Sequence, residues 1–432
     1  MDEELEQIFL DELAALDRMR ITYSGTYPNT PLSRDDPDVR RLLEGLAMFT
    51  ARTRVAGERA LHKNVLRIFR QHFAHLLGPA PAMGMIRAKP TPRFVNPAIL
   101  PADSEVLFVE PGERGANDRI FRFRTLGELR ILPLELVSLT PWQLPDKGWR
   151  FVFQFRWTTG HAMMMDVDDL HLHINHLDDL ASSLTISHAL ETYKRGSCIV
   201  FDQMAGEDTQ GAPCTITFGA PNRGVSMRRG EHPFRDIRNA MRFPAQQLFM
   251  NIHGIKLPKA VETFSVCLDV KPGFPVELRP MQDGFELFAI PIINERLDMA
   301  DPIEHDGTKE RYPVLHPDVA AKFVPVDVFG VYRITDKGLD PLEPAVISTH
   351  PKGARDGDSA RPTYDVTYEG VNQRRMAFVS AAIQNAFLKP VDLAVEATWH
   401  QPSVDTLSLD NIRVAPATRH FSGLEWSHSG PL

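Results

Sequence analysis

Three histidines and five aspartates gather in one short segment, DVDDLHLHINHLDD, at residues 166–179. The histidines are His171, His173 and His176. Imidazole nitrogens and carboxylate oxygens are common ligands of zinc and of non-haem iron. A metal ion held by this segment would make the protein a metal-dependent enzyme.

The spacing within the segment nevertheless favours a β-strand. Apolar and polar residues alternate, as on a strand with one polar face: Leu170, Leu172 and Ile174 against His171, His173 and Asn175. Two histidines on one face are fewer than the three protein ligands of a catalytic zinc site. An EF-hand calcium loop would need glycine and glutamate where the sequence has His171 and Leu177. We therefore predict a strand, then a helix beginning at Asn175 or Asp178, with no metal and no cofactor; a metal-dependent enzyme stays the alternative.

Other catalytic signatures are missing from the sequence. It contains no GxSxG elbow, no Walker loop, no GxGxxG fingerprint and no SxxK motif. The segment NRGVSMRRGEHPFRDIRNAMR is basic, and an anionic partner could dock there on its arginines: Arg223, Arg228, Arg229, Arg235, Arg238 and Arg242. A solvated loop that leads into a short helix is the interpretation we favour. We predict no catalytic residues.

The composition is that of a globular protein with substantial cores. The 432 residues are 43% hydrophobic and 24% charged, and 48 basic against 56 acidic residues give a net charge of -8. This balance argues against a nucleic-acid partner, because phosphate backbones attract basic surfaces. The acidic start MDEELEQ and the absence of a long apolar run predict neither a signal peptide nor membrane insertion, and hence a cytoplasmic protein. The three cysteines, Cys198, Cys214 and Cys267, form no CxxC pair and are predicted to be buried thiols.

The first 82 residues have the periodicity of amphipathic helices. Residues 2–20 carry apolar side chains at three- and four-residue spacing, and so do two further runs at 33–54 and 61–83. Asp35 or Asp36 can cap the second run, Pro37 suits a first helical turn, and Gly78 and Pro79 end the third. These apolar stripes need a partner, which is either another chain or the chain's own domain.

The rest of the chain is predicted to be rich in strands. Short β-branched and aromatic runs alternate with Pro-rich segments, as in SEVLFVE, RIFRFRT and WRFVFQFRW. We therefore predict an α+β protein: a helical arm at 1–82, a β-rich sandwich or mixed-sheet domain with an inserted helix at 83–270, and a second β-rich domain at 271–432. The stretch from DSARPTY to VSAAIQNA reads as mixed helix and loop, and HPKGARDGDSARP as an exposed loop.

Several segments, in the same order along the chain, resemble one family. DPDVRRLLEGLAMFTARTR resembles the DPxVxRLIEGFAFLxARxR helix of the type VI secretion baseplate subunit TssF, also called ImpG or VasA. MRFPAQQLFMNIHGI is similar to that family's FAFPEKFLFFDLxGL element, and FAIPIINERLDMADPIEHDGTKERYPVLHPD to its PVINLFxxxAEPIxxD...YxLVPD segment. LHLHINHLDD lies where the family has a strand and then a helix. The chain ends at Leu432, where longer members continue, which suggests a short or divergent member.

This resemblance implies a structural protein without enzymatic activity. Two copies of the family's protein join the smaller subunit TssG in a wedge of the baseplate, which surrounds the spike hub, nucleates the contractile sheath and docks at the inner face of the cell envelope. A baseplate protein of a related phage-tail-like particle is an alternative. The helical arm would then bundle between chains through its apolar stripes: Leu5, Ile8, Phe9, Leu13, Leu16, Val39, Leu42, Leu43, Leu46 and Phe49. Phe243, Pro244 and Phe249 occupy the family's aromatic element and are predicted to anchor a β-domain core.

Overall fold

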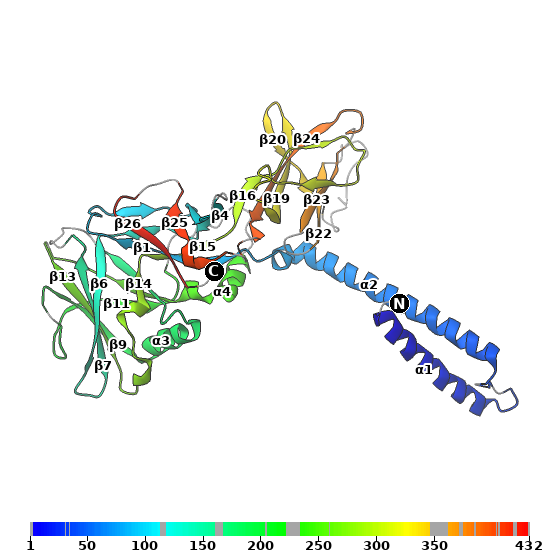
Figure 1. Cartoon of the computed structure of the whole chain (residues 1–432), viewed down its shortest axis with the longest axis horizontal. Helices are drawn as coiled ribbons and strands as arrows, with labels where there is room; N and C mark the ends of the chain where they lie inside the picture. Colours follow the sequence, from blue (N-terminus) through cyan, green and yellow to red (C-terminus); the bar gives the residue numbers. More distant parts are fainter. Residues whose placement is uncertain are drawn as a thin grey trace, which may run out of the picture. The chain divides into compact units, whose positions relative to one another are not determined.

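The computed structural model divides the chain into two compact units, Met1–Leu77 and Gly78–Leu432. Figure 1 shows the helices of the first unit and the sheets of the second. The structure describes residues 3–430 with these gaps: 31, 34, 113–117, 160–166, 204, 222–233, 259, 346–361, 371–374, 384–385, 403, 405–406 and 418–420.

The first unit is a pair of antiparallel helices, α1 (Glu3–Thr26) and α2 (Pro37–Leu77), which lie side by side in Figure 1. Ala47, Ala51 and Val55 follow one another at four-residue spacing on α2 and are buried. Arg54 of α2 donates to Glu12 of α1 at 3.3 Å beside this contact. Small residues at the contact let the two backbones approach closely, which is why a short apolar seam suffices to pair the helices.

The boundaries of these helices refine the prediction. The Asp36 carboxylate accepts from the backbone N–H of Asp38 at 2.9 Å, and Pro37 is the first helical residue, so the predicted start is confirmed. The second and third predicted runs form one helix of 41 residues. Gly57 between them stands in open space and does not end the helix, since a single glycine costs only about 1 kcal/mol there.

Most strands of the second unit surround one large core. Three sheets and a two-stranded ribbon contribute to it, and α3 (Leu180–Tyr193) adds Ile186 and Leu190. The six-stranded sheet runs β25 (Arg413–Pro416), β3 (Glu105–Glu110), β4 (Arg119–Thr125), β15 (Ala289–Ile293), β1 (Met83–Pro90) and β26 (Leu424–Ser429). The five-stranded sheet runs β10 (Ala212–Pro213), β9 (Lys194–Phe201), β13 (Thr263–Val270), β7 (Trp149–Trp157) and β6 (Leu134–Gln143). The four-stranded sheet runs β11 (Thr215–Phe218), β12 (Phe249–His253), β8 (Asp169–Ile174) and β14 (Phe285–Leu287), and the ribbon pairs β2 (Ala98–Leu100) with β5 (Leu129–Ile131).

A second, smaller core lies between two further sheets of the same unit. Its largest buried side chain is Trp399, and Tyr312, Val331 and Val395 pack with it. One sheet runs β16 (Arg296–Met299), β24 (Val391–His400), β19 (Val324–Thr335) and β20 (Gly338–Pro341), with β17 (Ile303–His305) also paired to β24. The other runs β18 (Tyr312–Val314), β23 (Met376–Ala382), β22 (Thr363–Glu369) and β21 (Glu343–Pro344). Helix α4 (Phe234–Arg242) and the 3-10 turns η1 (Pro244–Gln247), η2 (Val276–Leu278), η3 (Gln282–Gly284) and η6 (Leu409–Asn411) complete the described elements.

The alternation that predicted strands is confirmed in most places. Phe121 and Phe123 of β4 are buried, as are Phe151, Phe153 and Phe155 of β7. One prediction was wrong: the stretch read as mixed helix and loop forms β22 and β23, which pair antiparallel. Tyr364, Val366 and Tyr368 alternate on β22 and pack on the second core, so a strand signal was present in the sequence. Residues 346–361, which include most of the predicted loop HPKGARDGDSARP, lie outside the described residues.

Strands from both sides of position 270 share sheets. β14 pairs with β8, β15 pairs with β1 and β4, and β25 and β26 return after the second core to pair with β3 and β1. The second core therefore belongs to a segment inserted, along the chain, into the strands of the first. The division at 82/83 and 270/271 stays a proposal.

Candidate functional site

An apolar row on α2 points away from α1. Leu42, Leu46 and Phe49 leave 70, 42 and 68% of their surface exposed, whereas Ala51 is fully buried against α1. Because successive helical residues turn by about 100°, Phe49 and Ala51 lie about 200° apart around the helix axis. We call Leu42, Leu46 and Phe49 the outer row. These exposures show that the described residues of this unit leave much of the outer row open to solvent.

The other predicted partner residues are partly covered by their own chain. Leu5, Ile8, Phe9, Leu13 and Leu16 are half-buried and share one face of α1. Glu12 on the same turns reaches Arg54 of α2, so this face meets α2. On α2, Val39 and Leu43 are half-buried as well. The pairing of α1 with α2 explains this burial, and the role of these residues in binding another chain stays a prediction.

The described part of the helical unit exposes much more apolar surface than the outer row. Thirteen large hydrophobic side chains between Leu10 and Phe69 are at least 36% exposed: Leu10, Met19, Ile21, Tyr23, Tyr27, Leu32, Leu42, Leu46, Phe49, Leu61, Val65, Ile68 and Phe69. So many exposed apolar side chains on one pair of helices favour an interaction site, since monomeric soluble proteins rarely present large apolar patches. The helical unit is therefore the candidate interaction surface.

The histidine segment forms the predicted strand, β8, on which His171 is half-buried and His173 is buried, and both imidazoles are in hydrogen-bond contact with other groups of the protein. The His171 ring contacts the Asn251 side-chain oxygen at 2.8 Å, and the His173 ring contacts Glu286 at 3.3 Å and the Ala245 carbonyl oxygen at 3.1 Å. His173 is only 3% exposed. Among the described residues, which exclude Asp166, no three His, Cys, Asp or Glu side chains converge as a metal site would require.

The helix after β8 begins later than predicted. Leu177 and Asp178 have φ angles of 55° and 53°, in the left-handed region, so neither Asn175 nor Asp178 opens the helix. Asp179 is the N-cap, and its carboxylate accepts from the backbone N–H of Ser182 at 2.8 Å. Hydrogen bonds from the side chain and the backbone N–H of Ser182 lower the pKa of Asp179.

Glu286 joins the histidine strand to the C-terminal strand β26. Its carboxylate accepts from the Ser429 hydroxyl at 2.6 Å and lies 3.7 Å from the Arg87 guanidinium. Burial alone would raise the pKa of Glu286, but the hydrogen bonds from His173 and Ser429 outweigh this effect and lower it. The geometry does not resemble a hydrolytic triad, because the serine donates to the carboxylate and not to the histidine. The cluster is a buried polar joint between strands.

The three residues of the predicted core anchor lie at the start of the neighbouring strand. Phe249 is 0% exposed and packs with Met85 and Ala289, and the half-buried Phe243 packs against this cluster. Pro244 begins the 3-10 turn η1 that connects them. The Phe249 ring lies 5.1 Å from the ring of His173. The energetic importance of these residues stays a prediction.

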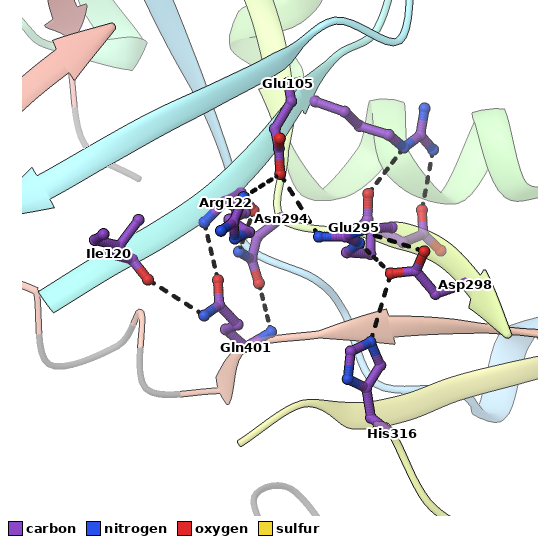
Figure 2. Close-up of polar contacts among 10 residues, drawn as sticks. Glu105, Ile120, Arg122, Asn294, Glu295, Asp298, His316 and Gln401 are labelled. Atoms are coloured by element: carbon purple, nitrogen blue, oxygen red, sulfur yellow. Dashed lines mark hydrogen bonds and ion pairs between the residues drawn. The ribbon is translucent and has the colours of Figure 1, made fainter. Parts of the chain in front are cut away.

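A polar junction connects the two cores of the second unit, and Figure 2 shows its contacts. The Gln401 side chain accepts from the Arg122 N–H at 2.9 Å and donates to the Ile120 carbonyl oxygen at 3.3 Å. The Asn294 side chain donates to the Arg122 carbonyl oxygen at 2.8 Å and accepts from the Gln401 N–H at 2.7 Å. Asn294 and Gln401 lie where the chain leaves the first core and where it returns. Their amides therefore bind both crossings to strand β4.

Charged side chains extend this junction, and among them Glu295 is buried. Arg124 pairs with Glu295 at 3.1 Å and with Asp103 at 2.7 Å. Arg122 pairs with Glu105 at 2.8 Å, and the same carboxylate lies 3.6 Å from Arg296. No prediction from the sequence included this site. The signal that could have indicated the junction is the pair of polar residues Asn294 and Glu295, which directly follow the apolar run FAIPII.

The predicted basic segment is described only in part. Residues 222–233, with Arg223, Arg228 and Arg229, lie outside the described residues, while Arg242 lies in the last turn of α4. The structure therefore leaves an anionic docking site untested. Across the described helices, none combines the length and the apolar character needed to span a membrane.

Comparison with known proteins identifies similar sequences and folds. The family model described as "Type VI secretion system, TssF" matches residues 1–414. A chain of the TssK-TssF-TssG baseplate subcomplex of the type VI secretion system, solved by cryo-electron microscopy, has a similar fold, with a TM-score of 0.66 and 16% sequence identity. The match covers 91% of this chain and 73% of that chain. No curated protein matches.

Proposed function

Because the chain belongs to the TssF family of the type VI secretion system, we propose that it is a structural subunit of the baseplate of this contractile injection machine. The family match covers both structural units, and the fold is similar to a chain of a baseplate subcomplex. We propose no enzymatic activity and no cofactor for it. The imidazoles of His171 and His173, on which the alternative of a metal-dependent enzyme rests, contact Asn251, Glu286 and the Ala245 carbonyl oxygen in the protein itself.

The outer row of α2 is the observation that carries this proposal. Leu42, Leu46 and Phe49 are exposed on a helix whose opposite side already holds α1. Covering such a row requires a further helix or another apolar surface, since water contact with apolar side chains costs roughly 25 cal/mol per Å². In a wedge, a second copy of this chain and a smaller TssG-like subunit would supply that surface by bundling with the helical unit. The half-buried face of α1 would extend the same bundle.

The β-rich unit has a different role in this proposal. Its two cores are buried and its strands are joined by the junction of Asn294 and Gln401, which favours a stiff body. We propose that it contacts further baseplate components, the spike hub and the sheath, and that assembly of the baseplate nucleates the sheath. The protein would act in the cytoplasm, at the inner face of the envelope where the machine docks.

A charge placed in the outer row tests the proposed interface. Leu42→Asp together with Phe49→Asp should abolish co-purification with a co-expressed TssG-like subunit, because an unpaired carboxylate buried in an apolar contact costs several kcal/mol. Both residues are exposed, so circular dichroism and the thermal midpoint of the isolated chain should stay unchanged.

Arg52→Asp is the matched control. Arg52 is exposed on the same helix but outside the outer row, and this variant should still co-purify with the partner. If the double variant binds the partner as the unaltered protein does, the outer row is not the interface. If the control also fails to bind, then net charge rather than the apolar contact controls assembly.

A further inference from the structure

Two cysteines far apart in the sequence lie directly opposite each other in the five-stranded sheet. Cys198 of β9 pairs with Cys267 of β13 in an antiparallel ladder. Opposed residues of such a ladder have Cα atoms about 4.5–5.5 Å apart and side chains on the same face. A disulfide needs a Cα separation of roughly 4.4–6.8 Å. The register therefore places the two thiols within bonding reach without backbone movement.

The face that carries the two thiols is a small apolar cluster. Val152, Val200, Ala205 and Cys267 are buried together, and Cys198 packs against them half-buried. The prediction that all three cysteines are buried is thus correct only for Cys267. Cys198 is the partner that solvent reaches, and Cys267 lies behind it.

Three groups stabilise a thiolate at Cys198. The Cys267 thiol donates a hydrogen bond to it, the Arg150 guanidinium faces it, and the backbone N–H of Gly211 donates to it. The hydrogen bond from Cys267 is the largest effect, and together these groups lower the pKa of Cys198 to about 6 despite its burial and the nearby carboxylate of Asp269. The hydrogen bond that Cys267 donates to Cys198 and, after it, burial raise the pKa of Cys267. Of the two thiols, the more accessible Cys198 therefore has the lower pKa.

The fold holds these groups in place. Arg150 pairs with Asp269 at 2.7 Å and donates to the carbonyl oxygens of Thr209 and Gly206 at 2.7 and 3.1 Å. These bonds fix the segment between β9 and β10 over the sheet. Position 211 must be glycine, because a Cβ there would collide with the Ile199 carbonyl oxygen. That close approach also brings the Gly211 N–H to the thiol.

Cys214 offers an internal comparison. It is half-buried like Cys198, but its pKa is raised because burial outweighs the hydrogen bond from Ser197. No ladder of the described strands places another cysteine opposite it. A reactive thiol needs thiolate character and access, and only the 198–267 pair combines these with a bonding partner.

We propose that Cys198 and Cys267 form a redox-active dithiol that closes to an intrachain disulfide on reaction with a low-molecular-weight disulfide such as oxidised glutathione. The Cys198 thiolate attacks one glutathione sulfur, the glutathione disulfide breaks, and one glutathione leaves as a thiolate that takes up a proton. Cys267 then loses its proton and attacks the Cys198 sulfur, which releases the second glutathione. Two cysteine thiols are oxidised and one glutathione disulfide is reduced to two thiols. The new bond staples β9 to the central strand β13.

Thiol counting and mass spectrometry test the proposal. The whole chain is incubated with oxidised glutathione, unreacted thiols are titrated after unfolding, and disulfide-linked peptides are identified. The thiol count should fall from three to one, with a peptide that links Cys198 to Cys267 and loss of two hydrogens from the intact mass. Dithiothreitol should restore three thiols. Oxidation should raise the thermal midpoint by several degrees, since closing a long loop constrains the unfolded chain.

Single variants decide the assignment. Cys214→Ser should form the disulfide as the unaltered chain does. Cys198→Ser should form none, and Cys267→Ser should stop at a mixed disulfide with glutathione on Cys198. If Cys267→Ser is unstable, Cys198→Ser with Cys214→Ser carries the test, because neither side chain is fully buried. Retention of three thiols, a link through Cys214, or dimers joined between chains would overturn the proposal.

Discussion

Gln401→Ala should weaken the junction between the two cores of the β-rich unit. Gln401 is 4% exposed, and its amide bonds the Arg122 N–H at 2.9 Å and the Ile120 carbonyl oxygen at 3.3 Å. Alanine leaves both backbone groups without this partner. An orphaned backbone group costs about 1–3 kcal/mol when it is fully buried, and the cost here belongs at the lower end, because Arg122 is half-buried and Ile120 is 45% exposed. We therefore expect the free energy of unfolding to fall by about 1–3 kcal/mol.

Urea unfolding followed by tryptophan fluorescence measures this loss. Gln143→Ala is the matched control, because Gln143 is exposed at the end of β6 and its substitution should change stability by less than about 0.5 kcal/mol. A Gln401 variant no less stable than this control would refute the reasoning. The midpoint should shift while the dependence on urea stays the same, since both states keep their exposed surface.

A double-mutant cycle sharpens the test. Asn294 contacts Gln401 directly and binds the Arg122 carbonyl oxygen, so the two amides form one network. Asn294→Ala with Gln401→Ala should then cost less than the sum of the single variants, by 0.5 kcal/mol or more. Strict additivity would mean that the amides act independently and that the two crossings are not held as one joint.

Two further substitutions test a buried ring and an ionised side chain of the β-rich unit. Phe249→Ala should lower the free energy of unfolding by about 3–5 kcal/mol in a thermal or urea melt, because the ring is fully buried. The control Phe387→Ala should change it by less than about 0.5 kcal/mol, because Phe387 is 75% exposed. Equal effects of the two substitutions would contradict the anchor role of Phe249. Asp306→Asn should remove a pH dependence: backbone and side-chain hydrogen bonds from Thr308 lower the pKa of Asp306 to about 2 from 3.8, so its contribution to stability is present above about pH 4 and lost as the pH falls toward 2. Melts at pH 5 and pH 2.5 should therefore differ less in Asp306→Asn than in the unaltered chain, and an unchanged difference would count against it.

Local periodicity predicted most of the elements of this protein. The four-residue spacing in the first 77 residues predicted helices, and the alternation of Phe151, Phe153 and Phe155 predicted β7 with its apolar face. Asp36 and Pro37 gave the start of α2, because capping depends on neighbouring residues alone. The order of short motifs along the chain indicated the family that the comparison confirmed. These features are local, so the sequence carries them without knowledge of the fold.

The tertiary structure decided which elements meet. Alternation predicted a polar face for β8, yet His173 is buried because β12 and β14 flank that strand and Glu286 and Ala245 lie against its ring. Nothing near Asn294 indicates that Gln401 will bond it, and the register of β9 and β13 alone places Cys198 opposite Cys267. Pairing between distant strands depends on loop closure and on the sum of many weak contacts across the whole core. A short window of sequence therefore shows which face of an element is apolar, but not which other element that face will pack against.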